Sequence, residues 1–338
     1  MPQNNPPLEE HSIAIIASGS WATALVKVFT DSKNTVFWYV RTRSSRDFLQ
    51  THYRNKNYLK QLQFKPGQYI LSGQINEVIL KSKWIIFALP AAYLEETVAQ
   101  IKIPLSDKFI LSGIKGLLPK SKTTPANYFI ENLRFPKDQF LVLSGPSHAE
   151  EVASGQPVFL TLGCTSTKNA QRFRKQFKTA TFRMGLSSDI FGIEYAGVLK
   201  NIYAIAAGIT KGLNLGDNFL SILMSNALRE MDHFLDTIIP ASSRRIYDTV
   251  YLGDLMVTAY SEHSRNRKFG EFIGKGMNPY EIQQQIKMVA EGYRSVEIIY
   301  DLKQKHEAQT PILDCLYNIL YQSAPARIAF QKLNSTLS

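Results

Sequence analysis

The segment from residue 12 to residue 40 constrains the fold more than any other part of the chain. An apolar run over residues 12–17 is followed by the turn Ser18-Gly19-Ser20-Trp21, a helical pattern through Phe29 and a second apolar run over residues 35–40. Strand, tight turn, helix and strand in this order predict a βαβ unit with parallel strands. The chain is therefore expected to begin as an α/β protein.

Further strand candidates at residues 84–88, 109–111, 140–143 and 158–162 alternate with helical segments, as a mostly parallel sheet requires. From about residue 188 the pattern changes to long helical stretches, with a short ambiguous run at residues 246–250. A single core stops growing near ~250 residues, so 338 residues favour two domains. We expect an α/β chain with a Rossmann-like doubly wound sheet over residues 1–188 and an all-helical domain over residues 189–338.

The charge and composition narrow the class of protein. The net charge is +11, and the basic residues are spread along the chain, which favours the attraction of small anionic molecules. The sequence shows no stretch in which basic and aromatic residues alternate, as a nucleic-acid-binding surface would. The densest basic cluster, residues 168–178, is interpreted as the solvated face of a helix. No nucleic-acid partner is therefore expected.

The cysteines and the apolar stretches of the sequence indicate the cellular compartment and the metal content. Cys164 and Cys315 are the only cysteines, which indicates neither a metal site nor a disulfide framework. The first eleven residues are polar and proline-rich, and no apolar stretch approaches the ~18 residues of a membrane span. We expect a cytoplasmic protein with no metal and no integral membrane segment.

The turn after the first strand has the place and part of the sequence of a dinucleotide-binding turn. The pattern is Gly-x-Gly-x-x-Gly/Ala, in which backbone N–H groups at a helix N-terminus meet a diphosphate. This chain has Ala17-Ser18-Gly19-Ser20-Trp21-Ala22, so Gly19 stands at the central position and Ala17 replaces the first glycine. Ser18, Gly19, Ser20 and Trp21 are the candidate residues for contact with the cofactor.

Basic residues follow the second strand, where an acidic residue would bind the ribose hydroxyls of NAD. Arg41 and Arg43 suit a ribose 2′-phosphate and favour NADPH over NADH. The alternative is a basic turn on the surface.

Lys200 is the only charged residue between Glu194 and Lys211, on a helix face with small residues at Gly197 and Ala204. Burial of an ammonium group costs several kcal/mol unless the group is paired. Burial also lowers the pKa of a lysine, which makes the lysine usable as a proton donor or acceptor near neutrality. The segment alone leaves open whether Lys200 is buried for chemistry or extends from the helix into water.

Two sets of polar residues could surround an anionic substrate. Asp254 could pair with a lysine, and Ser264-Arg265-Asn266-Arg267 offers a planar guanidinium and neutral hydrogen bonds to a phosphate. Lys115, Gly145 and Ser147 follow strand candidates at the edge where open α/β sheets bind ligands. The alternative interpretations are a basic helix end, a capping aspartate and ordinary loops.

Together these segments resemble the bacterial-type NAD(P)-dependent glycerol-3-phosphate dehydrogenase family over nearly the whole chain. The motifs that carry the resemblance are Leu-Ser-Gly-Pro-Ser at 143–147, Leu-Lys-Asn at 199–201, Gly-Leu-Asn-Leu-Gly-Asp-Asn at 212–218, Leu-Gly-Asp-Leu at 252–255 and Ser-Arg-Asn-Arg at 264–267. The chain departs from the family at Ala17, Ala22, His148 and Tyr251.

The resemblance implies roles for single residues. It implies that Lys200 is the acid/base residue, oriented by Asp254. The residues that it places around the substrate are Lys115, Gly145, Ser147, Lys200, Asp254, Ser264, Arg265 and Asn266. The residues that it places at NADP or NAD, beside the turn, are Ser20, Trp21, Arg41, Lys115, Ala149, Arg265 and Glu291.

The resemblance also implies the reaction: reversible reduction of dihydroxyacetone phosphate to sn-glycerol 3-phosphate, which supplies glycerophospholipid synthesis. Two alternative functions stay open. One is a β-hydroxy acid dehydrogenase with the same two-domain plan, and the other is a non-catalytic nucleotide-binding sensor whose glycine turn has decayed. A homodimer is compatible with the sequence, which does not fix the oligomeric state.

Overall fold

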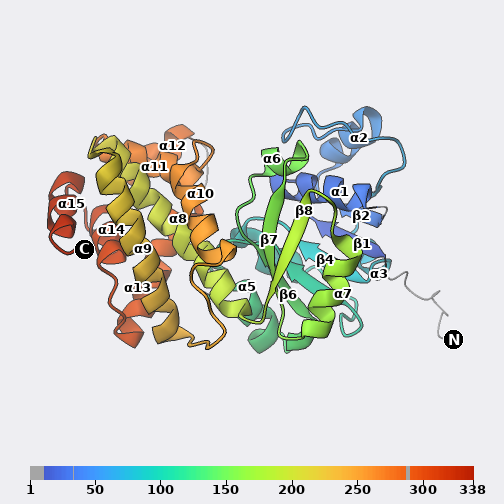
Figure 1. Cartoon of the computed structure of the whole chain (residues 1–338). Helices are drawn as coiled ribbons and strands as arrows, with labels where there is room; N and C mark the ends of the chain where they lie inside the picture. Colours follow the sequence, from blue (N-terminus) through green and yellow to red (C-terminus); the bar gives the residue numbers. More distant parts are fainter. Residues whose placement is uncertain (1–10, 33, 287–289) are drawn as a thin grey trace. The chain divides into compact units, whose positions relative to one another are not determined.

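The computed structural model of the protein describes residues 11–32, 34–286 and 290–338. The chain divides into two compact units between Ile190 and Phe191 (Figure 1). The first unit contains a sheet flanked by helices, and the described part of the second contains helices as its regular elements. The predicted fold class, a Rossmann-like sheet followed by a helical part, is confirmed.

One sheet of eight strands organises the first unit. The strands are β1 (Ser12–Ile16), β2 (Thr35–Tyr39), β3 (Ile70–Ser72), β4 (Trp84–Phe87), β5 (Phe109–Ser112), β6 (Phe140–Ser144), β7 (Val158–Gly163) and β8 (Phe182–Ser187). Their order is β3-β2-β1-β4-β5-β6-β7-β8, and all neighbours are parallel except β6 and β7. The direction of winding reverses between β1 and β4, which is where open α/β sheets bind ligands.

Sequence patterns did not indicate two of these strands. β3 has three residues and lies at an edge of the sheet, and β8 lies at the other edge with Arg183 exposed. Edge strands carry a weaker hydrophobic pattern because one side of the strand lacks a neighbour. The ambiguous run at residues 246–250 forms a turn that leads into a π-helical turn, η4 (Thr249–Gly253), and contains no strand.

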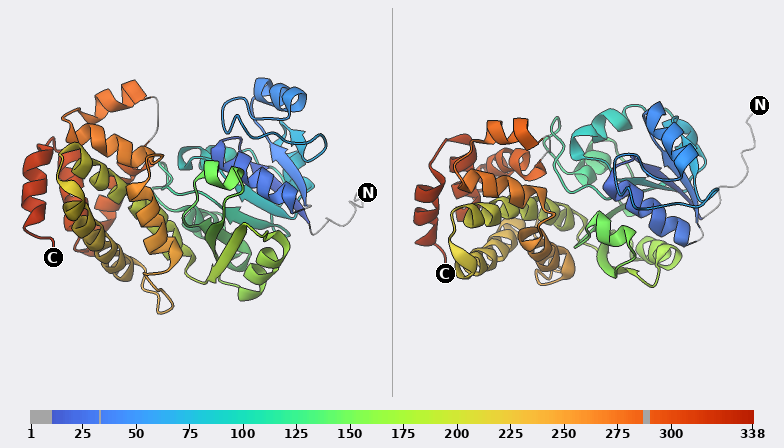
Figure 2. Two further views of the ribbon diagram at one scale, coloured as in Figure 1. Left: turned by 45° about the horizontal axis from the view of Figure 1, so that its top comes forward. Right: turned by 90° about the horizontal axis from the view of Figure 1, so that it is seen from above.

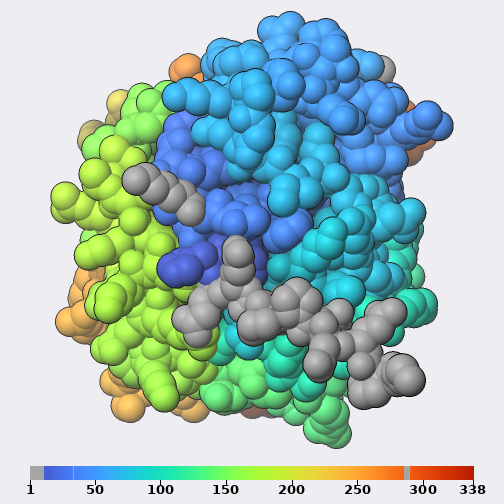
Figure 3. Space-filling view, turned by 90° about the vertical axis from the view of Figure 1, so that its right-hand side faces the viewer, coloured from blue at the N-terminus to red at the C-terminus, as the bar shows by residue number. Residues whose placement is uncertain are grey.

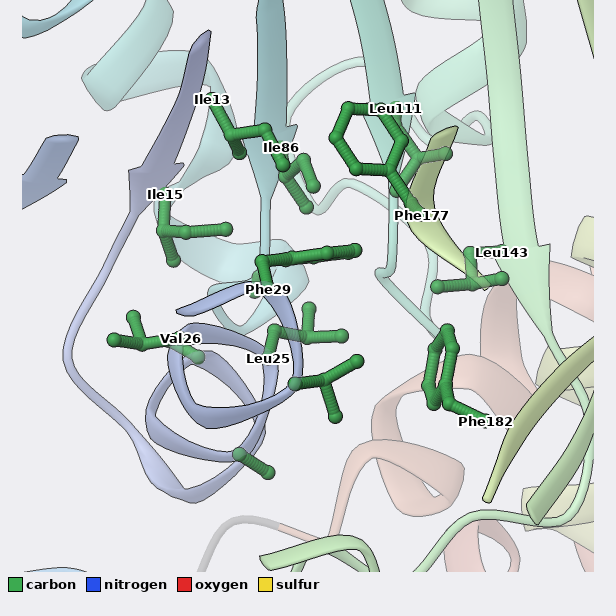
Figure 4. Close-up of a cluster of buried hydrophobic side chains, with 14 of the residues drawn as sticks. Ile13, Ile15, Leu25, Val26, Phe29, Ile86, Leu111, Leu143, Phe177 and Phe182 are labelled. Carbon is green, nitrogen blue, oxygen red and sulfur yellow. The ribbon is translucent and has the colours of Figure 1, made fainter. Parts of the chain in front are cut away.

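Helices cover both faces of the sheet. The helical segments of the first unit are α1 (Ser20–Asp31), α2 (Arg43–His52), α3 (Ile75–Leu80), η1 (Ala91–Tyr93), α4 (Leu94–Val98), α5 (Pro125–Asn127), η2 (Tyr128–Asn132), η3 (Lys137–Gln139), α6 (Ala149–Ala153) and α7 (Thr167–Phe177). On one face, Leu25 and Phe29 of α1 pack against Ile15 and Ile86 of the central strands (Figure 4). On the other face, the Phe129 ring of η2 lies 5.5 Å from that of Phe87. Burial on both faces explains the continuous apolar strands.

α7 confirms the interpretation of the basic cluster at residues 168–178. Phe173 and Phe177 are buried against Phe29 of α1, while Lys168 and Lys175 are exposed. Figure 3 shows one face of the first unit, with the α7 region in yellow-green and the α2 region in blue. The basic residues of α7 therefore form the solvated face of an amphipathic helix.

The second unit is built around one buried helix. Its helical segments are α8 (Ile190–Gly212), α9 (Gly216–Ile238), η4, α10 (Asp254–Tyr260), α11 (Arg265–Gly274), α12 (Pro279–Ile286), α13 (Glu291–His306), α14 (Pro311–Tyr321) and α15 (Ala326–Asn334), shown from yellow-green to red in Figure 2. α8 is long and apolar enough to span a membrane, but 94% of its apolar window is buried inside the structure. A core helix of a globular domain has these same properties.

Glu230, on α9, caps another helix of the second unit. Its Oε2 accepts a hydrogen bond from the N–H of Ile312 at 2.6 Å, and its Oε1 accepts one from the N–H of Leu313 at 3.0 Å. Both amides belong to the first turn of α14, where N–H groups have no partner within their own helix. Burial raises the pKa of Glu230 to about 8, although the two amide hydrogen bonds lower it.

This raised pKa predicts a pH-dependent stability. The folded state binds the Glu230 proton more tightly than the unfolded state, where the pKa is near 4.5. The associated stability is complete below that value and is lost as the pH rises through about 8. We expect the free energy of unfolding of the wild type, relative to Glu230→Gln, to fall on the order of a few kcal/mol between about pH 5 and 9. Denaturant unfolding of both proteins measures this, and parallel pH curves would contradict it.

Candidate active site

The turn between β1 and α1 is open at Gly19. Gly19 is the N-cap of α1 and has an extended backbone, with φ −74° and ψ −178°, that any residue can adopt. No heavy atom lies within 4 Å of a Cβ placed at Gly19. The fold itself therefore does not require glycine at this position. The missing side chain leaves the backbone open, which fits the close approach of a cofactor diphosphate to a helix N-terminus.

Ala17, two residues earlier, shows the opposite situation. Its φ of +133° is a conformation that favours glycine, yet the residue is alanine. The turn thus keeps the backbone conformation expected of the first glycine of the pattern. The methyl group that the sequence places there is accommodated at the expense of backbone strain.

The other candidate cofactor residues of the first unit lie at the ends of strands or the starts of helices. Trp21 is partly buried in the first turn of α1, and its Nε1 packs against Gly113, directly after β5. Arg41 and Arg43 follow β2 and are exposed. Arg46 instead stabilises the loop after β2, because its Nη1 donates hydrogen bonds to the carbonyl oxygens of Val40 and Arg41 at 2.7 and 2.8 Å.

Lys115, Gly145 and Ser147 are brought together at the ends of β5 and β6. The Gly145 carbonyl oxygen accepts a hydrogen bond from Lys115 Nζ at 2.6 Å and another from Ser147 Oγ at 3.0 Å. Ala149 follows as the first residue of α6, with His148 as its N-cap. The first unit therefore groups an ammonium and a hydroxyl at the edge where α/β sheets bind ligands.

Lys200 is buried and paired within the second unit. Its Nζ lies 2.6 Å from Asp254 Oδ1, and the two side chains are only 8% and 2% exposed. Lys200 Nζ also donates to Thr258 Oγ1 at 2.8 Å, and Thr258 Oγ1 donates to the Asp254 carbonyl oxygen at 2.6 Å. Lys200 therefore does not extend into water, and its ammonium group is held in a fixed position by two residues of α10.

Thr258 was missed at the level of sequence. It stands four residues after Asp254 on α10, so both side chains lie on the same helix face. That spacing, together with a buried lysine, is the signal that could have indicated it.

The residues predicted to bind a phosphate lie at the start of α11. Ser264 is the N-cap, and its Oγ accepts a hydrogen bond from the N–H of Arg267 at 3.3 Å. Arg265 is exposed, whereas Asn266 is buried and its Oδ1 accepts the N–H of Gly292 at 3.0 Å. Glu291, the preceding residue, begins α13. Because the Gly292 N–H occupies the amide oxygen of Asn266, the orientation of the Asn266 NH₂ group is also fixed. That NH₂ group is a hydrogen-bond donor.

Glycines bring these elements into direct backbone contact with α8. A Cβ on Gly208 of α8 would overlap the Arg267 carbonyl oxygen, and a Cβ on Gly270 of α11 would overlap that of Ile205. A Cβ on Gly292 would collide with the carbonyl oxygen of Asn201, next to Lys200. These close approaches fix the start of α11 and of α13 relative to Lys200.

The described part of the chain contains no cluster of side chains that could bind a metal ion. Over residues 11–32, 34–286 and 290–338, His, Cys, Asp and Glu side chains do not gather in a group of three or more that could hold a metal ion.

The buried ion pair gives a prediction on stability. Replacing Asp254 by leucine removes the carboxylate from a buried ammonium group and is expected to lower the free energy of unfolding by about 3 to 5 kcal/mol. Adding Lys200→Met should restore most of that loss, because two apolar side chains then face each other. Denaturant unfolding of the wild type, the single variants and the double variant measures the coupling. Additive losses would show that the two side chains do not interact.

Comparisons with known proteins agree with the fold and with these motifs. The family model "NAD-dependent glycerol-3-phosphate dehydrogenase N-terminus" matches residues 12–170, and the model for the C-terminus of the same family matches residues 189–331. A glycerol-3-phosphate dehydrogenase (NAD(P)+) from Chlorobium phaeobacteroides is 33% identical over 95% of this chain and 96% of its own. One from Clostridium botulinum is 31% identical over the same shares, 95% and 96%.

A solved structure supports the same assignment. The crystal structure of glycerol-3-phosphate dehydrogenase from Coxiella burnetii matches with a TM-score of 0.86 and 28% identity, over 96% of this chain and 98% of that one. Both units of the chain are covered by these matches, in the same order. The chain belongs to the NAD-dependent glycerol-3-phosphate dehydrogenase family.

Proposed function

We propose that this protein catalyses the reversible, NAD(P)-dependent reduction of dihydroxyacetone phosphate to sn-glycerol 3-phosphate. The observation that carries the proposal is the buried Lys200, held by Asp254 and Thr258 in a chain whose relatives are named glycerol-3-phosphate dehydrogenases. A buried ammonium group that is held in one orientation can donate a proton to a substrate oxygen placed beside it. The product would supply the backbone for glycerophospholipid synthesis in the cytoplasm.

Most of the residues that would hold the cofactor lie in the first unit, and Arg265 and Glu291 lie in the second. Ser18, Gly19, Ser20 and Trp21 would lie along its diphosphate, since Gly19 leaves the backbone open at the N-terminus of α1. The other proposed contacts are Arg41, Lys115, Ala149, Arg265 and Glu291. When bound in its reduced form, the nicotinamide supplies the hydride that C2 of the substrate accepts.

Lys200 would act on the substrate oxygen. As hydride arrives at C2, the carbonyl oxygen develops negative charge, and Lys200 Nζ would donate a proton to it. In the oxidative direction Lys200 would take the proton from the C2 hydroxyl. Asp254 and Thr258 hold the ammonium group in one position, so little rearrangement is needed at the moment of transfer.

The substrate phosphate would be bound away from the reacting carbon. Arg265 would supply a charged fork, and Asn266 and Ser264 would add neutral hydrogen bonds. Lys115, Gly145 and Ser147 complete the proposed substrate contacts. Binding energy from the phosphate would then position the carbonyl group for reaction.

The oligomeric state is a separate question, and a homodimer stays a prediction.

The direct test is to mix the purified protein with dihydroxyacetone phosphate and follow the loss of NADPH and NADH absorbance in parallel. Oxidation of either cofactor supports the proposal. Cofactor binding without turnover, in folded protein, would favour the sensor interpretation.

A first variant tests the role of Lys200. Lys200→Met should lower kcat by about a hundredfold to ten-thousandfold, the range contributed by general acid-base catalysis. The dissociation constant for NADPH should change less than about twofold, because the proposed cofactor residues are elsewhere. Lys211→Met is the matched control, since Lys211 is on the same helix and 47% exposed. Retention of a tenth of the wild-type kcat by Lys200→Met would refute the assignment.

A second set tests the preference for NADPH. Arg41→Ala and Arg43→Ala should each weaken NADPH binding by about tenfold and leave NADH binding nearly unchanged, because only NADPH carries the 2′-phosphate. Arg54→Ala, which removes an exposed arginine beyond α2, serves as the control. Equal losses for both cofactors would mean that these arginines do not read the 2′-phosphate.

A further inference from the structure

Three consecutive carbonyl groups of the proposed cofactor turn are each held by a side chain. The carbonyl oxygen of Ala17 accepts a hydrogen bond from Trp38 Nε1 at 2.6 Å, and that of Ser18 accepts one from Asn55 Nδ2 at 2.9 Å. The carbonyl oxygen of Gly19 accepts one from Thr23 Oγ1 at 2.8 Å. Thr23 lies in the first turns of α1, four residues after Gly19, whereas Trp38 of β2 and Asn55 of the loop after α2 are distant from the turn in sequence.

These bonds determine where the N–H groups of the turn point. In a trans peptide the C=O of one residue and the N–H of the next point in opposite directions, and the chain has no cis peptide among its described residues. Carbonyl groups turned toward Trp38, Asn55 and Thr23 therefore direct the N–H groups of Ser18, Gly19 and Ser20 away from those side chains. N–H groups so directed are the donors that an approaching phosphate needs.

Trp38 is positioned to hold this arrangement firmly. Its side chain is fully buried, and its ring makes edge contacts with Phe64 and Tyr69 at centroid distances of 5.8 and 5.2 Å. In the sheet it pairs in register with Ile15, two residues before Ala17. The indole N–H therefore reaches Ala17 from a rigid base.

Ala17 is the residue of the turn that most needs such support. Its φ of +133° is strained for alanine, so the peptide that follows it has lower-energy orientations available. Turning that peptide would redirect the Ser18 N–H. A hydrogen bond from a fixed donor to the Ala17 carbonyl oxygen opposes the turn.

We propose that Trp38 is a positioning residue for cofactor binding: its indole N–H holds the strained Ala17 peptide so that the N–H groups of the turn face the cofactor diphosphate. This inference rests on the proposed function, in which the turn receives NADP or NAD. Trp38 does not touch the cofactor in this scheme and acts only through Ala17. It compensates for the replacement of the first glycine of the pattern.

The test is a double-variant cycle read by calorimetric titration of NADPH into the full chain, without substrate. Trp38→Phe keeps an aromatic ring and removes the donor, and it should raise the dissociation constant by about fivefold to tenfold, the value of one hydrogen bond. In the Ala17→Gly background, where the backbone conformation carries no strain, the same change should raise it by less than about twofold.

A matched control lies in the same aromatic group. Tyr69→Phe removes the hydrogen bond from Tyr69 Oη to the Leu49 carbonyl oxygen, which is not part of the turn, and should leave the dissociation constant unchanged. Denaturant unfolding of each variant confirms that it is folded at the titration temperature.

The outcomes distinguish a failure of the positioning role from a failure of the proposed function. If the wild type binds NADPH and Trp38→Phe binds it equally well, the positioning role is overturned while the proposed function stands. An equal loss with alanine and with glycine at position 17 would also overturn it, because Trp38 would then not act through the strained peptide. If the folded wild type binds neither NADPH nor NADH, the proposed function itself fails.

Discussion

The ion pair between Lys200 and Asp254 is the interaction around which the second unit is arranged. α8 is an apolar helix at the centre of that unit, and Lys200 is a charge in its interior. An ammonium group in such a place is tolerated only with a carboxylate at hydrogen-bond distance, and two apolar side chains would often be as stable. Stability alone thus gives no reason for the pair. The proposed proton transfer would give one, because general acid-base catalysis needs an ionisable side chain held in a fixed position.

The proposed proton transfer also requires that the residues proposed to bind the phosphate keep a fixed distance from Lys200. The second unit meets this requirement with glycines at positions 208, 270 and 292, which allow α11 and α13 to contact the backbone of α8 directly. Backbone contacts of this kind leave less freedom than contacts between long side chains, since no rotamer can change at the crossing. Asn266 is a further tie, because its amide oxygen is bound by the first turn of α13.

Much of the fold could be predicted because the βαβ pattern at residues 12–40 is local in sequence. The edge strands β3 and β8 could not, since their burial depends on neighbours that are formed elsewhere in the chain. The candidate site divides in the same way. The position of Lys200 on an apolar helix was visible, but whether it was buried or solvated depended on Asp254, fifty-four residues away. The contacts of Thr258 with Lys200 and of Trp38 with Ala17 likewise join residues that are far apart in sequence.

The turn at residues 17–19 shows why a degenerate glycine pattern can persist in a functional fold. The pattern asks for glycine at two places for different reasons. At position 19 the reason is space for a ligand, and no other residue can supply that space, because every side chain begins with a Cβ. At position 17 the reason is backbone conformation, which a hydrogen bond from a fixed donor such as Trp38 can enforce on an alanine. The second requirement can therefore be shared with distant residues, whereas the first cannot. A substitution at the first glycine is thus weaker evidence against cofactor binding than a substitution at the central one.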